Sequence, residues 1–158
     1  MNNMTTKIVS TGPRLTEKRI ARAEKALGVS FPAVYRRFLL EHNGGYPDDP
    51  HFRMPGARKG STRLGAVVDF AGIDTPEETT NIDYLLQTFQ DRVPARMFPI
   101  ARDPGGNLIL LSSKGKDAGT VYFWDHEREA DDGESPTERN LVAIADSFDA
   151  FLKKLGNA

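Results

Sequence analysis

Residues 98–127 read FPIARDPGGNLILLSSKGKDAGTVYFWDHE, and this stretch decides the fold. Three runs within it, 98–102, 107–112 and 120–125, are rich in β-branched, aliphatic and aromatic residues and are bounded by turn residues, as β-strands are. In the first turn, 103–106, proline fixes φ and two glycines accept positive φ, so the chain can reverse tightly. The stretch therefore predicts a three-strand antiparallel meander.

The last of these strands is apolar on both faces. Side chains alternate across a strand, so Val121 and Phe123 point one way while Tyr122 and Trp124 point the other. Two alternatives follow: the protein's own helices and loops cover both faces, or one face stays open to a partner. In the second case we expect Tyr122 and Trp124 to line the open face.

Helix signals lie on both sides of the meander in the sequence. Thr16 and Pro32 begin two segments whose apolar residues have helical spacing. A third segment of this kind runs to Phe89, and Asp146 or Ser147 caps a fourth near the C-terminus. Helices at both ends around a meander predict an α+β protein and not a parallel α/β sheet.

The remaining segments divide the chain simply. Residues 46–65 mix prolines, glycines and charges of both signs and are predicted to be a loop, with at most a short strand near 51–54. A strand is predicted at 66–70. We expect a loose, flexible leader at residues 1–14 and one domain over residues 15–158.

Composition excludes several classes of function. The chain has 158 residues, a formal net charge of −1 and no cysteine. It lacks the basic excess of a protein that neutralises phosphates, so nucleic acid is not an expected partner. Disulfides and cysteine-ligated zinc are excluded. No window has the apolar length of a signal peptide or a membrane span, so we expect a cytoplasmic protein without a membrane partner.

The segment after Trp124 is strongly acidic. Residues 125–138 hold seven acidic side chains against Arg128 alone, which leaves a net charge of −6. Gly133 and Pro136 disfavour a helix there. The segment is either a solvated loop that keeps the protein soluble or a binding surface for a basic partner.

Other candidate sites lie in two places. Asp125, His126 and Glu127 are of metal-ligating types, but neighbours on a strand point to opposite faces, so we expect no metal site. No spacing suggests proton transfer or a nucleophile, and we expect neither catalysis nor a cofactor.

Tyr46, with Asp48 and Asp49, follows a glycine pair in a loop and is a candidate contact. Four basic residues form only a weak nucleic-acid signal: Arg53, Arg58, Lys59 and Arg63.

The ordered combination of these elements resembles the SMI1/KNR4 (SUKH) superfamily over about residues 15–155. No single motif is specific, and the order of all of them carries the resemblance. The first part comprises Ile20, Glu24, Leu27-Gly28, Phe31-Pro32, Tyr35, Phe38-Leu39 and Asn43-Gly44-Gly45-Tyr46-Pro47. The second part comprises residues 98–101, Asp103, Gly106-Asn107, residues 121–127, Ile144-Ala145, Ser147-Phe148 and Phe151-Leu152.

The resemblance implies a twisted, mainly antiparallel sheet packed by N-terminal, middle and C-terminal helices. In bacteria it implies an immunity protein that binds and blocks the toxin domain of a polymorphic or contact-dependent toxin system, often a nuclease with a basic surface. The alternative is a regulatory or scaffold module with a partner that is not a toxin. The expected partner-binding residues are Tyr46, Asp48, Asp49, Tyr122, Trp124, Glu127, Glu129, Asp131, Asp132 and Glu134.

Overall fold

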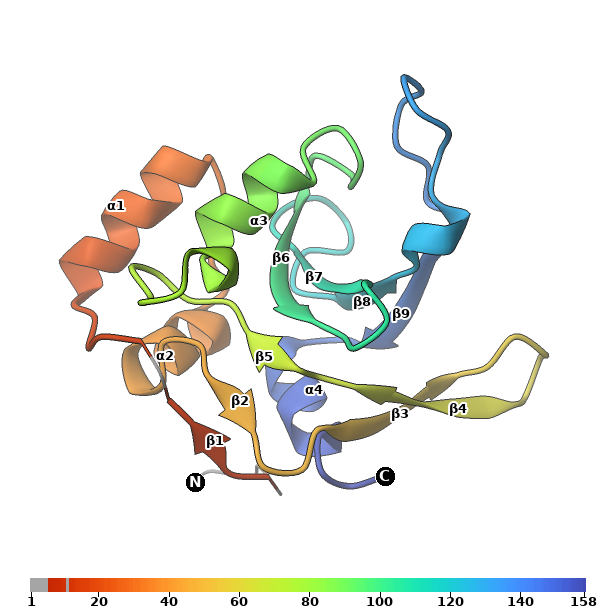
Figure 1. The fold of residues 1–158 in the computed structure, drawn as a ribbon, viewed down its shortest axis with the longest axis horizontal. Helices are drawn as coiled ribbons and strands as arrows, with labels where there is room; N and C mark the ends of the chain where they lie inside the picture. Colours follow the sequence, from red (N-terminus) through yellow and green to blue (C-terminus); the bar gives the residue numbers. More distant parts are fainter. Residues whose placement is uncertain (1–5, 11) are drawn as a thin grey trace.

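The computed structural model describes residues 6–10 and 12–158. The described residues have similar helix and strand content, which confirms the α+β class (Figure 1). The helices are α1 (Glu17–Leu27), α2 (Ala33–Glu41), α3 (Ile82–Thr88) and α4 (Phe148–Lys154), with 3-10 turns η1 (Glu78–Thr80) and η2 (His126–Arg128). The strands are β1 (Ile8–Val9), β2 (Tyr46–Pro47), β3 (His51–Pro55), β4 (Thr62–Ala66), β5 (Asp69–Phe70), β6 (Met97–Arg102), β7 (Leu108–Ser112), β8 (Val121–Trp124) and β9 (Leu141–Ala145).

The predicted meander is confirmed. Strands β6, β7 and β8 are antiparallel neighbours, and β5 and β9 extend them to a sheet of order β5-β6-β7-β8-β9. Two predicted helix caps are also confirmed, because the hydroxyls of Thr16 and Ser147 accept hydrogen bonds from backbone N–H groups three residues on. Each cap satisfies an otherwise unpaired N–H of the first helical turn.

Both faces of the meander are covered by the chain itself. On one face Val121 and Phe123 join the main core, together with Tyr35 of α2 and Phe148 of α4. On the other face Trp124 packs in a second cluster with Val93, Met97, Leu108 and Leu110, and Phe89 lies against it. The expectation of an open Tyr122/Trp124 face is therefore wrong, since α3 and the segment after it close that face.

Residues 46–70 differ from the prediction. The short strand allowed near 51–54 is present as β3, but it pairs with β4 in a hairpin inside the expected loop. The expected strand at 66–70 is divided between the end of β4 and β5. Phe52 and Met54 are buried while their neighbours in β3 are exposed, which is the alternation of a half-buried strand. Gly65 lies opposite Phe52, and a Cβ there would meet its ring at 2.4 Å, so only glycine fits.

The stretch expected as a loose leader also contains structure. Strand β1 pairs with β2 in antiparallel register, and Thr6 and Ile8 are buried. Gly45 allows the approach, because a Cβ there would lie 2.2 Å from the carbonyl oxygen of Val9. The remainder of the expected leader, residues 1–5 and 11, lies outside the described residues. Every helix in the described part of the chain is too short or too polar to cross a membrane.

Candidate partner-binding site

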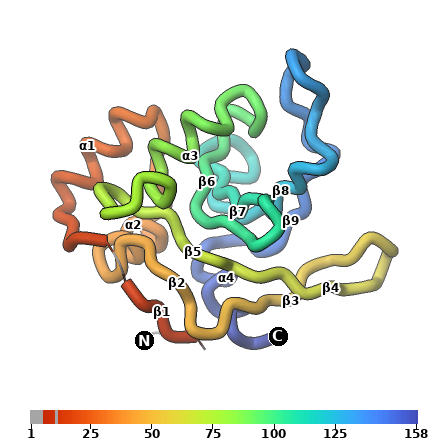
Figure 2. Tube along the Cα trace, viewed as in Figure 1, coloured from red at the N-terminus to blue at the C-terminus, as the bar shows by residue number. Residues whose placement is uncertain are grey.

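The acidic segment is an excursion of the chain between β8 and β9. Figure 2 shows it standing away from the sheet as the blue loop at the upper right. Its neck is closed by backbone and side-chain contacts: Asp125 N–H donates to the carbonyl of Asn140 at 3.0 Å, and the Asn140 side chain donates back to the carbonyl of Asp125. Arg139 donates to the carbonyls of Arg128 and Glu129. These contacts hold the two ends of the loop, residues 125–129 and 138–140, together where they leave the sheet, and we call these ends the neck.

Two arginines that follow α3 hold the two limbs of the loop. Arg92 forms a two-pronged pair with Glu129, with both N–O distances 3.2 Å, and its guanidinium lies 4.6 Å from the centre of the Phe89 ring. Arg96 grips Glu138 with contacts of 2.7 and 3.1 Å. Exposed ion pairs of this kind add at most about 1 kcal/mol each, so their main effect is to fix position.

Arg96 is fixed in turn by Asp117. The Asp117 carboxylate accepts hydrogen bonds from Arg96, from Ser112 at 2.8 Å and from the hydroxyl of Tyr122 at 2.7 Å. The Arg96 guanidinium, helped by these hydroxyls, holds the pKa of Asp117 far below its usual range. Arg96 also lowers the pKa of Glu138. Both carboxylates are therefore charged at neutral pH.

Replacing Asp117 by asparagine should lower the free energy of unfolding by about 2 kcal/mol at pH 7, because hydrogen bonds to a charged group are lost. A depressed pKa stabilises the fold at pH values above the unfolded pKa of about 4, and this stabilisation is lost as pH falls toward the folded pKa. The difference between wild type and Asp117→Asn should therefore shrink between pH 5 and pH 2. Urea unfolding across this range measures it.

If the difference in unfolding free energy between wild type and Asp117→Asn stayed constant with pH, the pKa of Asp117 would not be lower in the folded protein than in the unfolded chain. Asp146→Asn is the matched control, because Asp146 is exposed and no ion pair holds it in the described part of the chain.

The tip of the loop keeps its charges unpaired. Asp131, Asp132 and Glu134 are exposed, and no described basic side chain forms an ion pair with them. They border a hollow of about 390 Å³ together with Arg92 and Pro136. Glu127, at the neck, is exposed and likewise without an ion pair among the described residues, whereas Glu129 is bound to Arg92. The ion pairs Arg92–Glu129 and Arg96–Glu138, the two clamps of the loop, do not involve the tip. The negative charge of the tip is therefore available to solvent or to a partner.

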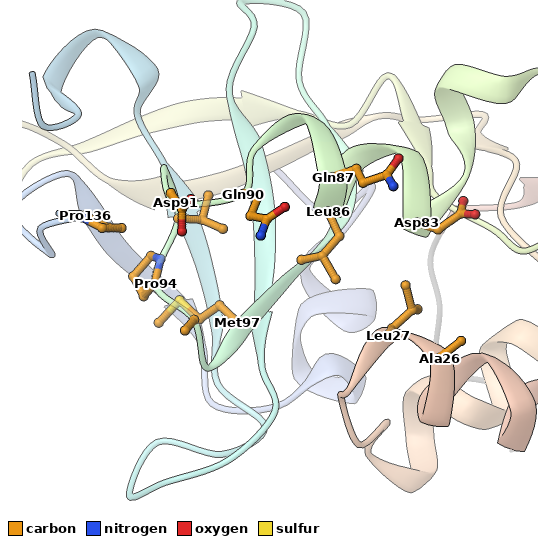
Figure 3. Close-up of a pocket in the computed structure, with 12 residues that line it drawn as sticks. Ala26, Leu27, Asp83, Leu86, Gln87, Gln90, Asp91, Pro94, Met97 and Pro136 are labelled. Carbon is orange, nitrogen blue, oxygen red and sulfur yellow. The ribbon is translucent and has the colours of Figure 1, made fainter. Parts of the chain in front are cut away.

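A larger, mostly apolar groove of about 820 Å³ adjoins the acidic loop. In Figure 3, Ala26 and Leu27 at the end of α1 lie at one end of the groove, and Pro136 of the acidic loop lies at the other. Leu86 of α3 stands between them. The sequence reasoning missed this groove, because its walls come from three segments far apart in the chain.

The structure does not bring all the predicted contact residues together. Tyr46, in β2, is 46% exposed, and Asp48 and Asp49, which follow β2, are exposed. All three lie at the opposite end of the molecule from the acidic loop (Figure 1). Tyr122 is partly buried and its hydroxyl is used by Asp117.

Trp124 is fully buried, so its expected role as a contact residue is corrected: the ring is part of the core. It packs edge-on against Phe89, with 5.6 Å between ring centres. Sheet alternation placed the ring on the right face, but it gave no sign that α3 covers that face.

Asp125, His126 and Glu127 are of metal-ligating types and follow one another at the start of the acidic segment. Within residues 6–10 and 12–158, no three metal-ligating side chains converge on a common point. His126 instead shares a hydrogen bond of 2.6 Å with the Asn107 side chain, which ties the start of the acidic segment to the first turn of the meander.

These features define a class: an α+β domain that presents a clamped acidic loop beside an apolar groove. The chain belongs to the SMI1/KNR4 family (SUKH-1), whose model matches residues 14–154, and the resemblance read from the sequence is confirmed. It is similar to the SPbeta prophage-derived uncharacterized protein YokK of Bacillus subtilis (strain 168). The identity is 27% over 155 residues, covering 89% of this chain and 74% of that protein. The family is of the immunity-protein type, generally non-enzymatic, which indicates a protein partner.

Proposed function

We propose that this protein is an immunity protein that binds a cognate bacterial toxin domain in the cytoplasm and neutralises it by direct contact, without catalysis. The observation that carries the proposal is the acidic tip: three exposed, unpaired carboxylates on a loop that two arginines hold in place. A toxin that acts on nucleic acid needs a basic surface to hold phosphates. The tip offers that surface the opposite charge, and the body of the protein behind it would block access.

Electrostatics explain why a clamped loop suits this task. A field of opposite sign speeds the encounter of two proteins, and a rigid loop loses less conformational entropy on binding than a mobile one. The first effect favours fast capture of a toxin, and the second favours tight binding. Membership of an immunity-type family and similarity to a prophage-derived protein support the same proposal.

Co-expression tests the proposal directly. The product of the gene immediately upstream should arrest growth when expressed alone, and this protein should restore growth and co-purify with it. A folded but unrelated acidic protein is the control for general charge effects. Toxicity that persists in the presence of the folded protein, with no complex recovered, would contradict the immunity function and favour a scaffold role with another partner.

A further inference from the structure

We infer that the apolar groove and the acidic tip form one continuous site for a basic, apolar-anchored segment of the partner protein: apolar side chains enter the groove, and adjoining lysines or arginines meet the tip. The inference rests on the proposed function, because it names the part of the toxin that would be held.

The floor and walls of the groove suit apolar side chains. Val93 and Met97 are buried at its floor, while Leu27, Leu86 and Pro136 are only partly buried at its walls. A volume of about 820 Å³ lies within the range of known ligand pockets, roughly 300–1,000 Å³. Burying such partly exposed apolar walls against a partner's side chain lowers the free energy of the complex, because apolar surface is removed from water.

The charges around the groove select the sign of the partner. Among the described lining residues, only Asp83 and Asp91 are charged, and both are exposed acids. Three guanidinium groups near these lining residues are already engaged by carboxylates: Arg92 by Glu129, Arg96 by Glu138 and Asp117, and Arg19 by Asp74. The site therefore favours a segment that carries positive charge and disfavours an acidic peptide or the phosphates of a nucleic acid.

Two residues make the groove and the tip continuous. Asp91 and Pro136 line both the groove and the hollow beside Asp131, Asp132 and Glu134. Asp91 has φ of 64°, in the left-handed region, which asparagine also tolerates, so Asp91→Asn removes the charge at the junction without new backbone strain. A segment whose apolar and basic side chains are adjacent in sequence would fill both parts at once.

Binding of short peptides tests the inference without any toxin. The probe is a capped peptide of two leucines followed by three lysines, titrated into the 15N-labelled protein by NMR. One control peptide has five lysines, and the other has two leucines followed by three glutamates. We expect shifts in the groove and in the tip with the probe, weaker shifts confined to the tip with five lysines, and none with the glutamate peptide.

Two variants locate the binding. Ala26→Arg places a bulky cation at an exposed position in the groove and should weaken binding of the probe about tenfold, equivalent to about 1.4 kcal/mol. Ala21→Arg is its matched control, with the same change on the exposed side of the same helix outside the groove, and should change the affinity less than twofold, or about 0.4 kcal/mol. Asp91→Asn should weaken binding of the probe and reduce its salt dependence.

Equal affinities for the leucine–lysine and lysine-only peptides would overturn the inference, as would equal effects of the two arginine variants or the absence of binding. Rescue from the toxin without groove binding would leave the proposed function intact and remove the groove from it. Groove binding without rescue would contradict the proposed function and would leave the groove as a binding site for a basic, apolar-anchored segment.

Discussion

Truncating Trp124 to alanine should lower the free energy of unfolding by about 3–5 kcal/mol, the loss typical of a large buried aromatic side chain. The ring has no exposed surface, and it is enclosed by the cluster of Met97, Leu108 and Leu110 with Phe89 edge-on against it. Alanine would leave a cavity between the sheet and α3. Urea unfolding at pH 7, followed by circular dichroism, measures the loss.

Tyr46→Ala is the control for removal of an aromatic ring from the surface. Tyr46 is 46% exposed, so its truncation should change stability by less than about 1 kcal/mol. If the two variants were equally stable, and Trp124→Ala instead lost binding to the partner, the ring would belong to the interface and not to the core.

Reversing the charge of the acidic tip should have the largest effect on function. Replacing Asp131, Asp132 and Glu134 together by lysine should slow association with the partner recovered by co-expression by about 10- to 10³-fold, because electrostatic steering becomes repulsion. The salt dependence of the association rate should fall as well. Stopped-flow or surface-binding kinetics at several salt concentrations give both quantities.

The folded state should be little affected, because none of the three carboxylates takes part in an ion pair among the described residues. A second triple variant, at Glu41, Glu78 and Asp146, makes the same change in net charge on other exposed parts of the surface. Equal slowing by both triple variants would show that net charge matters and the loop does not. An unchanged rate for the tip variant would remove the loop from the mechanism.

The parts of the fold that depend on local patterns were predictable. The meander was read from strands separated by short turns, and the caps at Thr16 and Ser147 depend on residues only three positions apart. The β3–β4 hairpin was missed because prolines and glycines around it obscured the alternation of Phe52 and Met54. The prediction of a loop follows from the proline and glycine content of this segment. The alternating burial of Phe52 and Met54 shows that the periodicity of the apolar residues predicts the structure better than this composition does.

The candidate site was only half predictable for a related reason. The charge of the acidic segment is visible in the sequence, but its clamps join Arg92 to Glu129 and Arg96 to Glu138, pairs 37 and 42 residues apart. No local spacing signals such pairs, and Arg92 and Arg96 read as ordinary surface residues. The groove is likewise assembled from α1, α3 and the acidic loop, so no single stretch contains its pattern.

The clamped neck of the acidic loop separates the sheet from the tip. The loop residues that form the neck, and those that Arg92 and Arg96 hold, lie at residues 125–129 and 138–140, outside the tip. Lengthening a loop costs little, about 0.6 kcal/mol for each doubling of its length. Insertions and substitutions between the clamps should therefore accumulate without harm to the sheet. If the proposed function holds, exchanging the tip between relatives should change the partner that is bound while the same sheet supports the loop.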